Sequence, residues 1–111
     1  MSEYPIEIDV QSVKALQESG EEFFFLDCRG QDEYNTAKIE GAVLIPMQEL
    51  TGRVEELAGF EDKRVVVHCH LGGRSLRVTH WLRQNGFPNT QNMTGGIEAW
   101  SHEIDDSIPR Y

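Results

Sequence analysis

A cysteine at the end of an apolar run, followed by a glycine-bearing segment and an arginine, could do covalent chemistry. The run is Val65–His68, and the segment after it consists of Cys69, His70, Leu71, Gly72, Gly73, Arg74 and Ser75. A thiolate is a good nucleophile, but a free thiol with a pKa of ~8.5 is only slightly ionised at neutral pH. Cys69 can therefore react only if its surroundings favour the anion.

Three features of this segment favour a thiolate at Cys69. Successive backbone N–H groups can converge on the sulfur, because Gly72 and Gly73 allow the positive φ angles that a tight curl requires. A helix that begins near Arg74 or Ser75 would direct the positive end of its dipole into the loop, and the guanidinium adds a permanent charge. Lowering the pKa by ~2 units needs ~2.7 kcal/mol, which these effects can supply together. The same cradle would bind a divalent anion presented to the sulfur.

Four residues separate Cys69 from Arg74, and this number indicates which anion the loop fits. The loop resembles the signature of the cysteine phosphatases, in which one more residue stands between the cysteine and the arginine. A ring one peptide shorter is too tight for a tetrahedral phosphoryl group but can enclose one additional sulfur atom. The sequence also shows no obvious aspartate, shortly after a tryptophan, that could protonate a leaving group. The spacing favours sulfur chemistry, with a phosphatase or an arsenate reductase as the alternative.

Strands and helices alternate along the chain, which predicts an α/β fold with an open, mainly parallel five-stranded sheet and helices on both faces. The strands are predicted at 5–10, 23–28, 42–46, 65–68 and 90–93. Helices are predicted from Asp9 to Gly20 and at 31–36, 47–57, 75–85 and 97–100. Trp81 and Trp100 are expected in the core.

Ligands of such sheets bind beyond the carboxyl ends of the strands. Cys69 follows one such end, and Asp27, Cys28 and Arg29 lie at another. We expect Asp27 and Arg29 to support the reactive loop, with Asp27 as a structural carboxylate that accepts N–H bonds. Cys28 is interpreted as a small core residue, with a redox role as a resolving thiol as the alternative.

Composition limits the classes of function. At 111 residues the chain predicts one domain over 1–111, and a net charge of −9 argues against a broad nucleic-acid-binding surface. No apolar run approaches the ~20 residues of a membrane span, and the N-terminus has no signal-peptide pattern. The two cysteines lie far apart and form no disulfide framework, so a cytoplasmic location is expected.

Histidines and cysteines near the loop raise the question of a metal site. His68, Cys69, His70 and Cys28 include no C-x2-C pair and no pair of histidines at helical spacing, and adjacent residues of a strand point to opposite faces. The pattern predicts no metal. His70 is interpreted as a solvent-facing loop residue, with proton transfer or substrate contact as the alternative.

Several motifs occur in an order typical of one family. Besides Cys69 to Ser75, they are Leu26-Asp27-Cys28-Arg29, Asp32-Glu33-Tyr34, Ile39-Glu40-Gly41-Ala42, Ile45-Pro46 and Gly95-Gly96-Ile97-Glu98-Ala99-Trp100. From about residue 6 to 111 the chain resembles single-domain rhodanese-like sulfurtransferases. It departs from the family's usual Gly-His-Ile-Pro-Gly-Ala, which reads Ala-Lys-Ile-Glu-Gly-Ala here, and from the commoner valine at the position of Cys28.

The resemblance implies a two-step transfer through a covalent intermediate. Cys69 would take a sulfur from a small anionic donor such as thiosulfate, and the persulfide would pass it to cyanide, a thiol or a sulfur-carrier protein, with no other cofactor. Arg74 would bind the anionic end of the donor and hold the loop, and Ser75 would cap the helix or bond to the loop. Relay of the persulfide to a carrier and a non-catalytic interaction module are the remaining alternatives.

Overall fold

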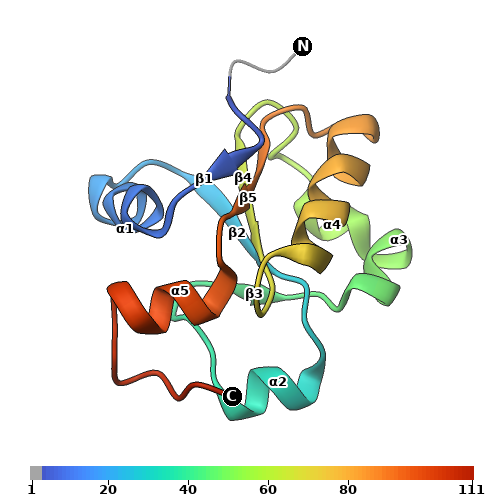
Figure 1. Ribbon diagram of the computed structural model, residues 1–111. Helices are drawn as coiled ribbons and strands as arrows, with labels where there is room; N and C mark the ends of the chain where they lie inside the picture. Colours follow the sequence, from blue (N-terminus) through green and yellow to red (C-terminus); the bar gives the residue numbers. More distant parts are fainter. Residues whose placement is uncertain (1–3) are drawn as a thin grey trace.

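Five parallel strands form one sheet in the computed structural model, which describes residues 4–111 (Figure 1). Their order across the sheet is β1-β5-β4-β2-β3, and each neighbouring pair runs parallel. The strands are β1 (Glu7–Ile8), β2 (Phe23–Asp27), β3 (Val43–Leu44), β4 (Arg64–His68) and β5 (Thr90–Met93). The predicted parallel sheet is confirmed, with β4 at its centre.

Helices cover both faces of this sheet, as predicted. The α-helices are α1 (Val10–Ser19), α2 (Gln31–Thr36), α3 (Leu50–Arg53), α4 (Gly73–Gln84) and α5 (Gly96–Glu103), and the 3₁₀ turns are η1 (Met47–Glu49) and η2 (Val54–Leu57). Figure 1 shows α1 and α5 on one side of the strands and α3 and α4 on the other. Each pair packs into its own buried apolar cluster.

The central strand β4 determines which side each following residue faces. Val65, Val66 and Val67 are fully buried, and their side chains alternate between the two apolar clusters. The alternation continues past the strand. The ring of His68 contacts that of Phe25 on the α1–α5 side, whereas Cys69 belongs to the cluster on the α3–α4 side.

The predicted caps of α1 are confirmed, and they show how local chemistry sets an element. Asp9 accepts a 2.8 Å hydrogen bond from the backbone N–H of Ser12, which satisfies a free donor of the first turn. Gly20 ends the helix at a φ of 80°, a left-handed conformation that favours glycine.

The prediction of one helix over 47–57 was wrong. This segment is divided into η1, α3 and η2, with Gly52 in the middle. Glycine and β-branched residues are poor helix formers, so burial of Leu50 and Leu57 holds three short turns instead of one regular helix. Trp81 lies only partly buried beside this segment, unlike the fully packed Trp100.

The two edge strands are shorter than predicted. Val10 already belongs to α1, and Ile45 and Pro46 lie outside β3, although the Ile45 N–H still donates 2.9 Å to the Asp27 carbonyl of β2. Val43 is 43% exposed, so β3 is an edge strand and not the buried strand that its apolar run indicated. Across residues 4–111, the longest helices are too short or too polar to cross a membrane.

Candidate active site

The sulfur of Cys69 lies in a ring of hydrogen-bond donors at the carboxyl end of β4. The Gly72 N–H lies 3.1 Å from Sγ, the Ser75 N–H lies 3.4 Å away and the Ser75 hydroxyl lies 3.3 Å away. The residue is only 1% exposed. The expected convergence of backbone N–H groups on the sulfur is therefore present in the structure.

These donors favour the anionic form of the thiol. Burial alone would raise the pKa of Cys69, but hydrogen bonds from the Ser75 side chain and from the backbone of Ser75, Gly72 and Arg74 outweigh it. The net result is a lowered pKa. Gly72 contributes through its φ of 116°, which turns the chain from the strand end into the first turn of α4.

The N-terminus of α5 holds the loop from behind. The Ile97 N–H donates 2.9 Å to the carbonyl of Cys69, and the Glu98 N–H donates 3.1 Å to that of His70. A Cβ at Gly96 would lie 2.5 Å and 2.4 Å from the same two carbonyl oxygens, so only glycine fits. The Gly95–Gly96 turn is thus in close contact with the loop that follows Cys69.

Ser75 connects the sulfur to β5 and β1. Its hydroxyl also lies within hydrogen-bond distance of Oδ1 of Asn92, which is 3% exposed. The Asn92 amide nitrogen donates to both carboxylate oxygens of Glu7, at 3.1 Å each, and to the carbonyl of Gly72 at 3.3 Å. Sequence reasoning missed Asn92, although three polar residues in the predicted strand 90–93, in a sheet covered on both faces, were a signal.

The guanidinium of Arg74 is paired with a carboxylate. Its two terminal nitrogens lie 2.7 Å and 2.9 Å from the two oxygens of Glu33 in α2, a bidentate geometry. Arg74 holds the pKa of Glu33 down at about 2. In this structure the arginine therefore anchors the loop to α2, and an anionic donor would have to share or replace that carboxylate.

Asp27 and Arg29 lie at the neighbouring strand end and form a buried pair. The Asp27 carboxylate accepts from the Arg29 backbone N–H at 3.0 Å, from Nε at 2.9 Å and from Nη2 at 2.7 Å. Arg29 also donates to the carbonyl of Ala37 and to the hydroxyl of Tyr111. Both members of the pair are fully buried, so they brace the start of the segment that carries Glu33.

Tyr111 closes the charged side of the site. Its hydroxyl donates 2.9 Å to Glu33 and accepts 2.7 Å from Arg29. Its ring stacks on His70 with centroids 4.0 Å apart, and burial is the main reason that the pKa of Tyr111 rises to about 12. Sequence reasoning missed the roles of Glu33 and Tyr111, although Glu33 stands in a motif that carried the family resemblance.

Cys28 and His68 are buried next to the loop and do not contact the sulfur by hydrogen bonds. Cys28 is a free cysteine in the apolar cluster that holds Cys69, and its burial raises the pKa of its thiol to about 12. The Nδ1 atom of His68 lies 3.2 Å from the carbonyl of Cys69. Among residues 4–111, no three or more His, Cys, Asp or Glu side chains are grouped to hold a metal ion.

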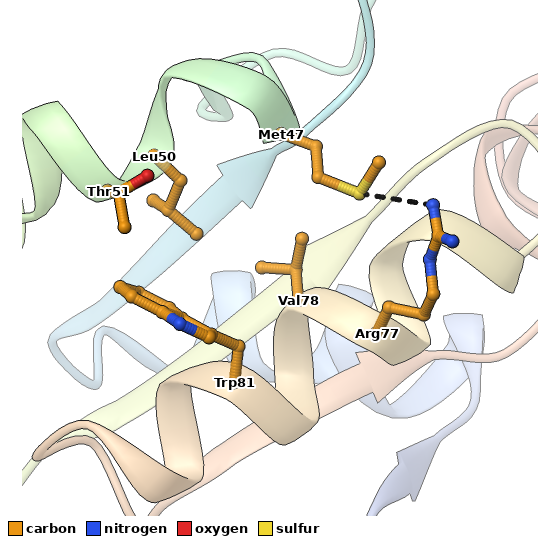
Figure 2. Close-up of a pocket in the computed structure, with 6 residues that line it drawn as sticks. All are labelled: Met47, Leu50, Thr51, Arg77, Val78 and Trp81. Carbon is orange, nitrogen blue, oxygen red and sulfur yellow. Dashed lines mark hydrogen bonds between the residues drawn. The ribbon is translucent and has the colours of Figure 1, made fainter.

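An apolar groove lies between the 47–57 segment and α4, with a volume of about 310 Å³ (Figure 2). Figure 2 shows the ring of Trp81 at one end and Arg77 at the other, where its guanidinium reaches Met47 Sδ at 3.7 Å. Leu50, Thr51 and Val78 also line it. Val78 belongs to the same buried cluster as Cys69, so the groove is adjacent to the core beneath the sulfur.

All the loop residues chosen from the sequence are brought to one edge of the sheet. Leu71 is 65% exposed and points away from the packed core, whereas Ser75 is fully buried against the sulfur. Gly73 begins α4, two residues earlier than predicted, which places Arg74 inside the first helical turn.

Comparison with known proteins agrees with this arrangement. A model of the rhodanese-like domain matches residues 9–103. The chain is 32% identical over 95 residues to a sulfurtransferase of Allochromatium vinosum, which covers 86% of this chain and 87% of that protein. A crystal structure of a rhodanese-like domain protein from Staphylococcus aureus has the same fold, with a TM-score of 0.81 and 23% identity over 96% of this chain and 99% of the other.

Other relatives are longer. An adenylyltransferase and sulfurtransferase of Zea mays is 32% identical over 109 residues, or 94% of this chain. The chain spans only 23% to 29% of the length of that protein and of two further curated relatives. The family match covers most of the chain, and a solved structure of this kind has the same fold. The chain belongs to the rhodanese-like domain family.

Proposed function

We propose that the protein is a thiosulfate-type sulfurtransferase that moves a sulfane sulfur through a persulfide on Cys69. The observation that carries this proposal is the ring of donors around the sulfur, formed by the Gly72 and Ser75 N–H groups and the Ser75 hydroxyl. A lowered pKa of the Cys69 thiol supports its use as a nucleophile.

The proposed first step balances without a further reagent. The Cys69 thiolate attacks the outer sulfur of thiosulfate, a new S–S bond forms, and the bond between the two donor sulfurs breaks with its electron pair on sulfite. The product is a persulfide anion, which the loop N–H groups can solvate as they do the thiolate. The transferred sulfur stays covalently bound, so the proposed chemistry uses no separate cofactor.

The size of the loop supports sulfur over phosphate as the transferred group. With four residues between Cys69 and Arg74, the donors already converge at 3.1 to 3.4 Å on one sulfur atom. Such a ring suits one more sulfur and leaves little room for a phosphoryl group, so a phosphatase or arsenate reductase is the weaker candidate. An intact nucleophile with a lowered pKa also disfavours a purely non-catalytic module.

In the proposed second step an acceptor nucleophile attacks the outer sulfur of the persulfide and regenerates the thiolate. Cyanide serves in an assay and a thiol in the cell. Relay to a sulfur-carrier protein is the second candidate, because a relative in Bacillus subtilis, 33% identical over 99 residues, is named a putative sulfur carrier protein. The free thiols of Cys28 and Cys69 suit the reducing cytoplasm, which is the proposed location.

Mass spectrometry tests the proposal directly. The protein incubated with thiosulfate should gain ~32 Da, located on Cys69, and lose it again on addition of cyanide. Cys69→Ser should gain nothing, and Cys28→Val is the matched control that should still gain the mass. A wild-type protein that stays unmodified while it hydrolyses aryl phosphates would refute the proposal.

A further inference from the structure

The hydroxyl of Ser75 has two acceptors but one proton. It lies 3.3 Å from the Cys69 sulfur and also within hydrogen-bond distance of Asn92 Oδ1. A hydroxyl donates one hydrogen bond at a time, although it can accept others. At any moment the Ser75 O–H therefore donates either to the Cys69 sulfur or to the Asn92 amide oxygen.

The orientation of the Asn92 amide is determined by its other partners. Its Nδ2 atom faces two carboxylate oxygens of Glu7 and the carbonyl of Gly72, all of which only accept hydrogen bonds. Oδ1 must then face Ser75. A rotated amide would bring oxygen against oxygen on the Glu7 side, so Asn92 is held as an acceptor.

From this geometry we infer that Asn92 is a positioning residue that competes with Cys69 for the Ser75 proton. When Cys69 is a thiol, its S–H donates to Ser75 Oγ and the Ser75 O–H donates to Asn92 Oδ1. When the thiol loses its proton, the Ser75 O–H turns to the sulfur and leaves the buried oxygen of Asn92 without that donor. Ionisation therefore breaks one hydrogen bond to form another, and Asn92 keeps the thiolate less stable than the loop alone would make it.

The effect can be separated from the other charges near the sulfur. These groups are Asp27 and Cys28 at the end of β2, Glu33 in α2, His68 and His70 on either side of the nucleophile, Arg74 in α4 and Glu7 in β1. A neutral substitution of Asn92 keeps each of these charges, but it also removes the amide's hydrogen bonds to Glu7 and Gly72, so the same substitution without the Ser75 hydroxyl serves as the control. The inference rests on the proposed function only in taking Cys69 as the nucleophile, and its test needs no sulfur donor.

The pH dependence of Cys69 alkylation by iodoacetamide, followed by peptide mass spectrometry, gives the pKa of this thiol. Asn92→Leu should lower that pKa by roughly half a unit to one unit, because the competing acceptor is gone. Gln91→Leu, which removes a buried amide on the other face of the same strand, should leave it unchanged. In a Ser75→Ala background, Asn92→Leu should have no effect. A folded Asn92→Leu protein with an unchanged or raised pKa overturns the inference, as does an equal fall without the Ser75 hydroxyl.

A second measurement uses the wild-type chain and does not depend on the folding of a variant. The NMR chemical shift of the Asn92 side-chain carbonyl carbon (Cγ), followed across the same pH range, should change with an inflection at the pKa of Cys69. The carbonyl carbon of the Gln91 side chain should show no such inflection. Cys69→Ala should abolish the inflection at Asn92. If the chemical shift of this Asn92 carbon does not change as Cys69 ionises, the inference is overturned, even if sulfur transfer itself is demonstrated.

Discussion

Cys69, at the end of β4, and Arg74, in the first turn of α4, are close in sequence, yet opposite kinds of groups surround them. The sulfur is buried and meets neutral donors, namely backbone N–H groups and the Ser75 hydroxyl. The guanidinium is partly exposed and is neutralised by the carboxylate of Glu33. The chain thus separates the neutral hydrogen bonds to the Cys69 sulfur from the ion pair of Arg74.

The two environments differ in how they respond to salt and to dissolved anions. Neutral dipoles in a buried site are held in place by the backbone and are little affected by salt. An ion pair that is about a third exposed can exchange partners with a dissolved anion. The sulfur side therefore depends on precise backbone placement, and the arginine side depends on the balance of charges.

The largest expected effect is on the sulfur side. Gly96→Ala would place a methyl group 2.4 to 2.5 Å from the carbonyls of His70 and Cys69, so the loop must move. A displacement of about 1 Å costs on the order of a hundredfold in rate, and we expect that loss in thiosulfate:cyanide turnover. Gly73→Ala is the control, because a Cβ there meets nothing within 4 Å. Equal activity of the two variants would mean that α5 does not position the loop.

A smaller effect is expected on the arginine side. Glu33→Gln keeps the shape of the side chain but releases the charge of Arg74, so an anionic donor should bind more tightly. We expect KM for thiosulfate to fall roughly threefold, in line with the modest energy of a partly exposed ion pair. Glu49→Gln removes the same charge from the distant Arg53 pair and should not change KM. A raised KM in Glu33→Gln would show that Glu33 mainly orients Arg74 for the donor and does not compete with the donor for it.

Tyr111→Phe should affect stability more than catalysis. It removes the hydroxyl that bonds to Arg29 and Glu33 but keeps the ring that stacks on His70. We expect a loss of about 1 kcal/mol in the free energy of unfolding, measured by urea denaturation. Tyr34→Phe is the comparison, because it removes the hydroxyl of another tyrosine, whose ring lies beneath the Lys38 ammonium. A loss in turnover larger than a few-fold at full stability would assign the hydroxyl to the chemistry.

The smallest effect is a pH dependence of stability. The pKa of Glu33 is lowered from 4.5 to about 2 in the folded chain, mainly by Arg74. Its charge therefore stabilises the fold above pH 4.5, and this contribution is lost as the pH falls toward 2. The gap in unfolding free energy between wild type and Glu33→Gln should be full at pH 6 and shrink below pH 4.5. A gap that stays constant down to pH 3 would contradict the assignment.

Local sequence was sufficient for much of the architecture. Alternating strands and helices predicted the parallel sheet, the caps Asp9 and Gly20 predicted the bounds of α1, and the run Val65–His68 predicted the central strand. These signals succeed because they depend on neighbours in the chain, such as a side chain and the N–H groups of the next turn. The prediction for segment 47–57 failed because its apolar spacing is typical of a helix, whereas Gly52 lowers the helix propensity. Packing then decided its conformation.

By itself the sequence determined the family, the length of the loop after Cys69 and the choice of Cys69 as the proposed nucleophile. Tertiary structure decided which side chains form hydrogen bonds with this loop and with Arg74, because these side chains come from distant parts of the chain. Glu33, Asn92 and Tyr111 reach the loop from α2, β5 and the C-terminal segment, and residue spacing alone does not reveal such contacts. A hydrogen bond depends on where two atoms meet in space, so the one proton of Ser75 and its two acceptors became visible only when the strands were placed side by side.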